Sequence, residues 1–216
     1  MKTDLLRPFE SIPYFTIEGF KQATGMESPT QVRVLLHRWM AGGKIIQLKK
    51  GLYMTSRFYE QHSGDFGFSA AVSAILVPQS YLSLQFVLQQ YNLLTEITYP
   101  ITCVTAKNTH TIVNRIGTFW YRHIREDLYR GFTITEYFGI QVAQASAAKA
   151  LFDTLYLRPL PKSFRAFKLN LTEELRLNLD EFSSTDRQEF TRLVEDSKSR
   201  KMMDILDNFR SNIWHP

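Results

Sequence analysis

The stretch SPTQVRVLLHRWMAGGKIIQLKKGLY, residues 28–53, decides how the N-terminal part of the chain folds. Ser28 suits the N-cap of a helix because its hydroxyl can accept a hydrogen bond from an unpaired amide of the first turn, and Gln31 completes a capping box. Pro29 falls at the first helical position, where its missing N–H costs nothing. The glycine pair at 42–43 ends the helix. The pattern therefore predicts a capped helix that stops at this glycine pair.

At 100° per residue this helix has one apolar face and one mainly polar face. The apolar face is expected to be buried and holds Val32, Leu35, Leu36, Trp39 and Met40. The opposite face and its flanks hold Thr30, Gln31, Arg33, Val34, His37 and Arg38. The first set must pack against other elements, and the second is left exposed.

A short basic hairpin follows the helix, with one strand over residues 45–48, a turn at Lys49-Lys50-Gly51 and a returning strand over 52–54. Two further helices are expected over residues 3–12 and 17–24. Helices followed by a hairpin with a basic tip are typical of a winged helix-turn-helix, in which one helix fits the DNA major groove and the hairpin lies along the backbone. The alternative is a small helical subdomain whose lysines are merely solvated.

The candidate DNA-binding residues come from the helix and the hairpin: Thr30, Gln31, Arg33, Val34, His37, Arg38, Lys44, Lys49 and Lys50. Arg33 can donate to guanine N7 and O6, and Val34 can contact a thymine methyl. The three lysines are expected to neutralise phosphates. Gln31 and Arg38 are expected to steady the helix against the DNA backbone.

Charge and composition fit this interpretation. The net charge is +5, and residues 1–62 hold nine Lys and Arg against five Asp and Glu, so the positive excess lies where phosphates would be met. No apolar run approaches the roughly 20 residues that span a bilayer, and the N-terminus lacks an apolar core of signal-peptide length. The single cysteine, Cys103, leaves no disulfide framework. We expect a cytoplasmic protein that does not interact with membranes.

Residues 57–66 contain two glycines and no clear period, which indicates a connector. The elements predicted after it are helices over 68–77 and 80–94, strands over 97–106, 112–124, 132–137 and 139–143, and a helix over 147–157 that Ser146 begins. Two more helices follow, and Thr185 with Gln188 predicts the capping box of the first.

This order of elements predicts an α+β fold with three regions. Residues 1–62 form the winged helix-turn-helix domain, and residues 63–162 form a mixed α+β domain. Residues 163–216 form a C-terminal helical segment that packs on the α+β domain. Lys149 and Asp153 stand four residues apart on one helix and are expected to pair at its surface.

The sequence contains no recognisable catalytic or metal-binding motif. Its five histidines are dispersed and no cysteine pair accompanies them, which argues against a zinc site. It has no Walker loop, no G-x-G-x-x-G and no G-x-S-x-G. Cys103 and His123 are a conceivable thiol–imidazole pair, but the apolar neighbours of Cys103 favour an inert core thiol. We expect no enzymatic activity, no metal and no cofactor. A DNA-modifying enzyme, the alternative, would need an acidic metal cluster assembled from distant residues.

Five phrases along nearly the whole chain carry a family resemblance: IIQLKKGLY at 45–53, Y-L-S-L at Tyr81–Leu84, ITCVTA at Ile101–Ala106, F-G-I-Q-V-A at Phe138–Ala143 and A-K-A-L-F-D at Ala148–Asp153. In this order they resemble the AbiEi family of antitoxin-regulators from bacterial type IV toxin–antitoxin systems. The family often has a proline and a glutamate ahead of the K-A-L phrase, where this chain has Ala147 and Ala148.

The resemblance implies that the winged helix represses its own operon by binding inverted repeats in the promoter, so double-stranded DNA is the expected ligand. It implies that the larger C-terminal part neutralises a nucleotidyltransferase-like toxin, AbiEii, without a need for stable contact. The expected function is an autorepressor and antitoxin. The alternative is a winged-helix protein-interaction module without sequence-specific DNA binding, with the methionine-lined C-terminal helices as a second surface.

Overall fold

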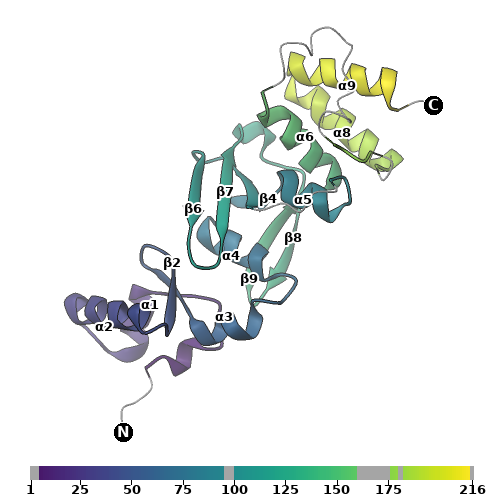
Figure 1. The fold of residues 1–216 in the computed structure, drawn as a ribbon. Helices are drawn as coiled ribbons and strands as arrows, with labels where there is room; N and C mark the ends of the chain where they lie inside the picture. The colour runs from purple at the N-terminus through teal and green to yellow at the C-terminus, as the bar shows by residue number, and fades with distance from the viewer. Residues whose placement is uncertain (1–4, 95–99, 160–175, 180–181, 215–216) are drawn as a thin grey trace. The chain divides into compact units, whose positions relative to one another are not determined.

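The structure is a computed structural model that describes residues 5–94, 100–159, 176–179 and 182–214. It has the mixed α+β fold that the sequence predicts, with two β-sheets (Figure 1). The chain divides into two compact units. Unit 1 comprises Met1–Pro78, Ile112–Thr118 and Glu136–Gln141, and unit 2 comprises Gln79–Thr111, Phe119–Thr135 and Val142–Pro216. The three predicted regions stay predictions, and the boundary at 162–163 lies outside the described residues.

Before Pro78 the chain forms short helices and one small sheet. In order these are η1 (Arg7–Phe9), β1 (Phe15–Thr16), α1 (Ile17–Thr24), α2 (Pro29–Ala41), β2 (Ile45–Lys49), β3 (Leu52–Thr55), α3 (Ser56–His62) and α4 (Phe68–Leu76). The sheet is antiparallel with the order β1-β3-β2. The predicted helix over 3–12 is wrong, since its described part contains only the 3-10 turn η1. Pro8 has no N–H to donate, and its ring disfavours a helix that continues through it.

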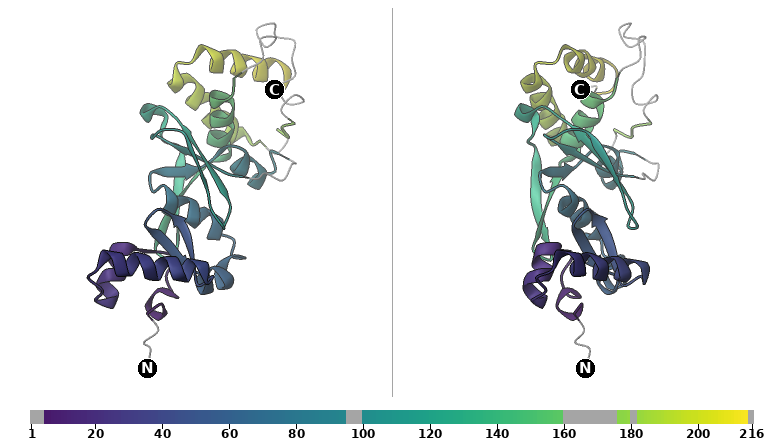
Figure 2. Two further views of the ribbon diagram at one scale, coloured as in Figure 1. Left: turned by 60° about the vertical axis from the view of Figure 1, so that its left-hand side comes forward. Right: turned by 90° about the vertical axis from the view of Figure 1, so that its left-hand side faces the viewer.

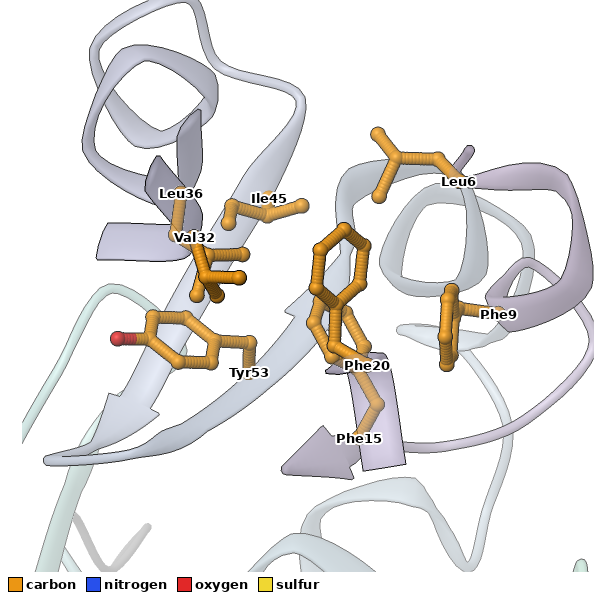
Figure 3. Packing of buried hydrophobic residues seen from close by; sticks show 8 residues of the cluster. All are labelled: Leu6, Phe9, Phe15, Phe20, Val32, Leu36, Ile45 and Tyr53. Carbon is orange, nitrogen blue, oxygen red and sulfur yellow. The ribbon is translucent and has the colours of Figure 1, made fainter. Parts of the chain in front are cut away.

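The core of this region draws side chains from η1, β1, α1, α2 and the β2–β3 hairpin. Eight of them converge in Figure 3: Leu6, Phe9, Phe15, Phe20, Val32, Leu36, Ile45 and Tyr53. The ring centroids of Phe9 and Phe15 lie 4.7 Å apart, and the Trp39 ring meets Phe20 edge-on at 5.5 Å. Each such aromatic pair contributes about 0.5–1.5 kcal/mol of stability beyond what the burial of its apolar surface provides. The core thus fixes α2 and the hairpin as one body.

The predicted connector over 57–66 is wrong in its first half, where α3 lies. The Thr55 hydroxyl caps this helix by accepting from the Phe58 N–H at 3.1 Å, and the Phe58 side chain is fully buried. A seven-residue helix offers too few positions to display a helical period in the sequence. Its stability comes from the cap and the buried anchor.

After Pro78 the chain forms a second sheet with covering helices. Its elements are β4 (Ser80–Leu82), α5 (Leu84–Gln90), β5 (Ile101–Thr105), β6 (His110–Val113), β7 (Thr118–His123), η2 (Glu126–Leu128), β8 (Phe132–Tyr137), β9 (Ile140–Ala145), α6 (Ala147–Leu157), α8 (Ser184–Ser197) and α9 (Arg200–Asn212). The strand order is β6-β7-β5-β4-β9-β8. Strand β4 is antiparallel to β5 and parallel to β9, and β5 is parallel to β7.

Two predicted elements differ from the observed ones. The predicted helix over 80–94 is strand β4 followed by α5, because Leu84 has a left-handed φ of +60° that breaks a continuous helix. The predicted strand over 112–124 is a hairpin, β6 and β7, whose turn is closed by Asn114 Oδ1 accepting from Ile116 N–H at 2.9 Å. Strand β8 and helix α6 are confirmed with the predicted bounds.

Helices α6, α8 and α9 contact one another and lie together in both views of Figure 2. The predicted capping box at Thr185 and Gln188 is wrong, because the box is formed two residues earlier. The Ser183 hydroxyl accepts from Asp186 N–H at 3.1 Å, and the Asp186 carboxylate accepts from Ser183 N–H at 3.1 Å. A capping-box pattern occurs twice in the sequence, once from Ser183 to Asp186 and once from Thr185 to Gln188, and the sequence alone does not decide which of them caps the helix.

Candidate nucleic-acid interface

Helix α2 carries the candidate DNA-binding residues and is fixed by its cap and its buried face. The Ser28 hydroxyl accepts from the Gln31 N–H at 3.4 Å, and Pro29 is the first helical residue, as predicted. Val32 and Leu36 are buried in the core shown in Figure 3. Because these two side chains set the rotation of the helix about its own axis, its opposite face is held toward solvent.

The six candidate residues of α2 are all exposed: Thr30, Gln31, Arg33, Val34, His37 and Arg38. Val34 lies within this polar face and exposes 53% of its surface. Within the described residues, neither Arg33 nor Arg38 forms an ion pair with a carboxylate. The face therefore combines an apolar contact with guanidinium donors that no neighbouring acid neutralises.

A shallow groove of about 370 Å³ runs along this face of α2. Its lining mixes apolar and polar side chains: Met26, Thr30, Gln31, Val34, Leu35 and Arg38. Four of these six belong to the predicted contact set. Leu35 and Met26 are additions to that set. The sequence assigned Leu35 to the buried face, and Met26 precedes the helix, where no helical pattern places it.

Three exposed lysines, Lys44, Lys49 and Lys50, lie in or next to the β2–β3 hairpin. Lys44 precedes β2, and Lys50 lies in the turn next to Gly51, whose φ is +79°. Glycine adopts this left-handed conformation without the steric cost that a Cβ would bring. In the part of the chain that the structure describes, neither Lys44 nor Lys50 is paired with a carboxylate. Both charges are therefore open to an anionic ligand.

Lys49 is placed differently from the other two lysines. Its Nζ donates to the backbone oxygen of Leu76 at 2.6 Å, at the C-terminal end of α4. Carbonyl groups at the end of a helix carry partial negative charge and attract cations. The neighbouring Leu48 backbone oxygen accepts from Asn114 Nδ2 at 2.9 Å. These contacts direct the Lys49 ammonium to α4 and hold β2 in place.

A second polar cluster is buried in unit 2, where the sequence predicted a surface ion pair. Lys149 Nζ donates to Asp153 Oδ1 at 2.6 Å, so the pair itself is confirmed, but both side chains have zero exposure and the surface position is wrong. Tyr81 and Ser83 hydroxyls donate to Asp153 Oδ2 at 2.9 and 2.7 Å. The Leu128 backbone oxygen accepts from Lys149 Nζ at 3.0 Å.

Burial governs the ionisation of this cluster. It raises the pKa of Asp153 and lowers the pKa of Lys149, while the charge of each acts on its partner in the opposite sense. Burial also raises the pKa of Tyr81 well above its usual value. Every polar atom of the pair has a partner, and neither side chain reaches solvent. The cluster therefore joins β4, α5 and α6 and offers no access to a substrate.

A third polar group lies in unit 1, where the β8–β9 turn meets the segment after α3. The Asp65 carboxylate accepts from the Tyr137 hydroxyl at 2.7 Å and lies 2.8 Å from His62 Nδ1. The Tyr137 hydrogen bond, followed by that of His62, holds the pKa of Asp65 below its usual value. Phe138 has a left-handed φ of +48° and packs edge-on against Phe58. The contacts fasten the turn to α3.

Across 5–94, 100–159, 176–179 and 182–214, no three His, Cys, Asp or Glu side chains gather closely enough to hold a metal ion. No helix in these ranges combines the length and apolarity needed to cross a membrane. The side chain of Cys103 is buried in β5. In the register of β5 and β7, Cys103 lies opposite Tyr121, and His123 lies opposite Thr105.

No protein-family model matches the chain, and no curated protein matches its sequence.

Proposed function

We propose that the protein binds double-stranded DNA through a winged helix-turn-helix formed by α1, α2 and the β2–β3 hairpin. The observation that carries the proposal is the exposed face of α2. Its buried side is held by Val32 and Leu36, and its outer side presents six potential contact residues, whose two arginines form no ion pair with a carboxylate of the described residues. A helix held in this way fits the width of the major groove, and an adjacent basic hairpin fits the phosphate backbone.

The contact residues divide into base-reading and phosphate-binding sets. We assign Arg33 to guanine N7 and O6 and Val34 to a thymine methyl, with Thr30 and His37 beside them in the major groove. Arg38 and Gln31 face the backbone. Lys44 and Lys50 neutralise phosphates from the hairpin. The Lys49 ammonium already has the Leu76 carbonyl as a partner, so we assign it the role of anchoring β2.

We further propose that the protein is an autorepressor and the antitoxin of an AbiE-like type IV system, with inverted repeats of its own promoter as the DNA site. This step rests on the five phrases that resemble the AbiEi family. Two of them are joined in the fold, because Tyr81 and Ser83 of the Y-L-S-L phrase both donate to Asp153 of the A-K-A-L-F-D phrase. The functional partner would be an AbiEii toxin, and the protein would act in the cytoplasm without catalysis of its own.

A protein-interaction module is the second candidate, and one observation favours it. The lining of the groove on α2 includes the apolar side chains of Met26, Val34 and Leu35. Apolar side chains that line a groove are typical of protein contact sites. DNA binding and protein binding by this surface differ in their response to salt. Phosphate contacts weaken steeply as salt rises, whereas apolar contacts do not.

The experiment that separates the two is a titration of the protein against the duplex upstream of its own gene and against a scrambled duplex of equal composition, each at two salt concentrations. The proposal predicts binding to the upstream duplex that is at least about a hundredfold tighter than binding to the scramble. Equal, weak binding to both duplexes would leave the protein-interaction module as the better function.

A further inference from the structure

A second groove, of about 400 Å³, lies on helices α8 and α9, far in sequence from the proposed DNA interface. Its lining contains three arginines, two neutral hydrogen-bonding side chains and one acid: Arg187, Arg192, Arg210, Gln188, Thr191 and Glu195. Five of these residues lie on one stripe of α8, and Arg210 is contributed by α9. The formal charge of the lining is positive, with three guanidinium groups against one carboxylate.

Arg187 is held in position by an aromatic platform. Its guanidinium carbon lies 5.9 Å from the centroid of the Trp214 ring. The Trp214 ring stacks on Phe182 at 6.0 Å and packs against Phe190 and Phe209 at 5.8 and 5.3 Å. Arginine stacks well on aromatic faces because its guanidinium is planar and weakly hydrated. The platform therefore limits the orientations of this guanidinium before any ligand arrives.

The guanidinium charges of the groove are not balanced by carboxylates among the residues that the structure describes. None of the three arginines forms an ion pair with a carboxylate of the described residues, whereas Arg57, Arg125 and Arg130 each do. The Nε of Arg187 is buried and has no hydrogen-bond partner within the same residues. A buried donor without a partner is costly. An anion in the groove would meet a guanidinium that has already lost part of its water.

We propose that this groove binds a phosphoryl group. Guanidinium groups bind phosphate through paired N–H donors, and several arginines around one concavity suit an ion of more than one negative charge. The Thr191 hydroxyl and the Gln188 amide add neutral donors to the same lining. A ligand with only one carboxylate group would leave most of these donors without an acceptor. The alternative is a solvated helix face that binds no anion measurably. A direct titration distinguishes this alternative from a phosphoryl site.

The test is isothermal titration of the full chain with inorganic pyrophosphate, with sodium chloride adjusted so that ionic strength stays constant. We expect saturable binding by the wild type. Arg187→Gln and Arg192→Gln should each weaken it by about tenfold or more, as expected for the loss of a charge-assisted contact. Arg192 is exposed, so its variant keeps the test valid if Arg187→Gln disturbs the packing on Trp214.

Arg122→Gln is the matched control, because Arg122 is an exposed residue of strand β7 and does not line the groove. It should leave pyrophosphate binding unchanged. To identify the source of the phosphoryl group, the same titration is made with a 5′-phosphorylated oligonucleotide and with the oligonucleotide of the same sequence that ends in a 5′-hydroxyl. Stronger binding of the phosphorylated form, lost in Arg192→Gln, assigns the group to a nucleic-acid end, and equal binding of the two assigns it to a free anion.

Two results would overturn the proposal. One is the lack of any saturable binding of pyrophosphate by the wild type with an affinity better than about 1 mM. The other is binding that Arg122→Gln weakens as much as Arg192→Gln does, which would mean diffuse attraction to a basic protein. The groove is separate from α2, so either result leaves the proposed DNA binding untouched.

Discussion

Nζ of Lys149 lies 2.6 Å from Oδ1 of Asp153 across one turn of α6, and neither side chain is exposed to solvent. A buried ion pair is weak support for stability when compared with apolar residues of the same size, because both charges lose their water. Loss of one partner is a different matter, since it leaves the other charge uncompensated in the interior. The pair therefore disfavours any arrangement of β4, α5 and α6 that would separate the two charges.

Asp153→Ala is expected to destabilise the protein by about 3–5 kcal/mol, because it leaves the Lys149 ammonium buried without its counter-charge and removes the acceptor of Tyr81 and Ser83. The double variant Lys149→Met/Asp153→Leu should lose much less, since no charge remains in the interior. Urea denaturation followed by circular dichroism measures both. A double variant as unstable as Asp153→Ala would contradict this view of the pair.

The Asp65 contact gives a prediction about pH. Because the Tyr137 hydrogen bond holds the pKa of Asp65 below its usual 3.8, the ionised carboxylate stabilises unit 1 above about pH 4. That contribution is lost as the pH falls from 3.8 through the lowered value. Tyr137→Phe should raise the pKa of Asp65 toward 3.8, as measured by carboxyl-carbon NMR titration. His62→Gln should raise it less, and an unchanged pKa in Tyr137→Phe would refute the assignment.

The two neighbouring lysines of the hairpin should differ in their effect on DNA binding. Lys50→Ala removes an unpaired charge and is expected to weaken binding to all duplexes and to reduce the salt slope by about one. Lys49→Ala is the matched control, because the Lys49 ammonium is held by the Leu76 carbonyl at 2.6 Å. It should change the slope less than Lys50→Ala does. Equal slope changes would show that both lysines meet phosphates.

The cap signals of the sequence predicted much of the local structure. Ser28 and Pro29 placed the start of α2, and Ser146 placed the start of α6. The 100° period also placed the exposed face of α2, which is the larger part of the candidate interface. These features depend on residues within one or two turns of each other, which is the range over which sequence patterns carry structural information.

The features that the sequence missed depend on distant residues. The i, i+4 spacing of Lys149 and Asp153 predicts their pairing, but their burial is decided by Tyr81 and Ser83, about 70 positions away. In the same way, Lys49 donates to the Leu76 carbonyl at the end of α4, which lies 27 positions away. A local pattern has no means to indicate either contact.

The most direct test of base reading by α2 compares wild type and Arg33→Ala on the upstream duplex and on the scrambled duplex at one salt concentration. We predict that Arg33→Ala loses about 1–3 kcal/mol on the upstream duplex and little on the scramble, because a guanine contact has been removed while the phosphate contacts remain. An equal loss on both duplexes would contradict the assignment, and Arg33 would then be a phosphate contact on a surface that does not read sequence.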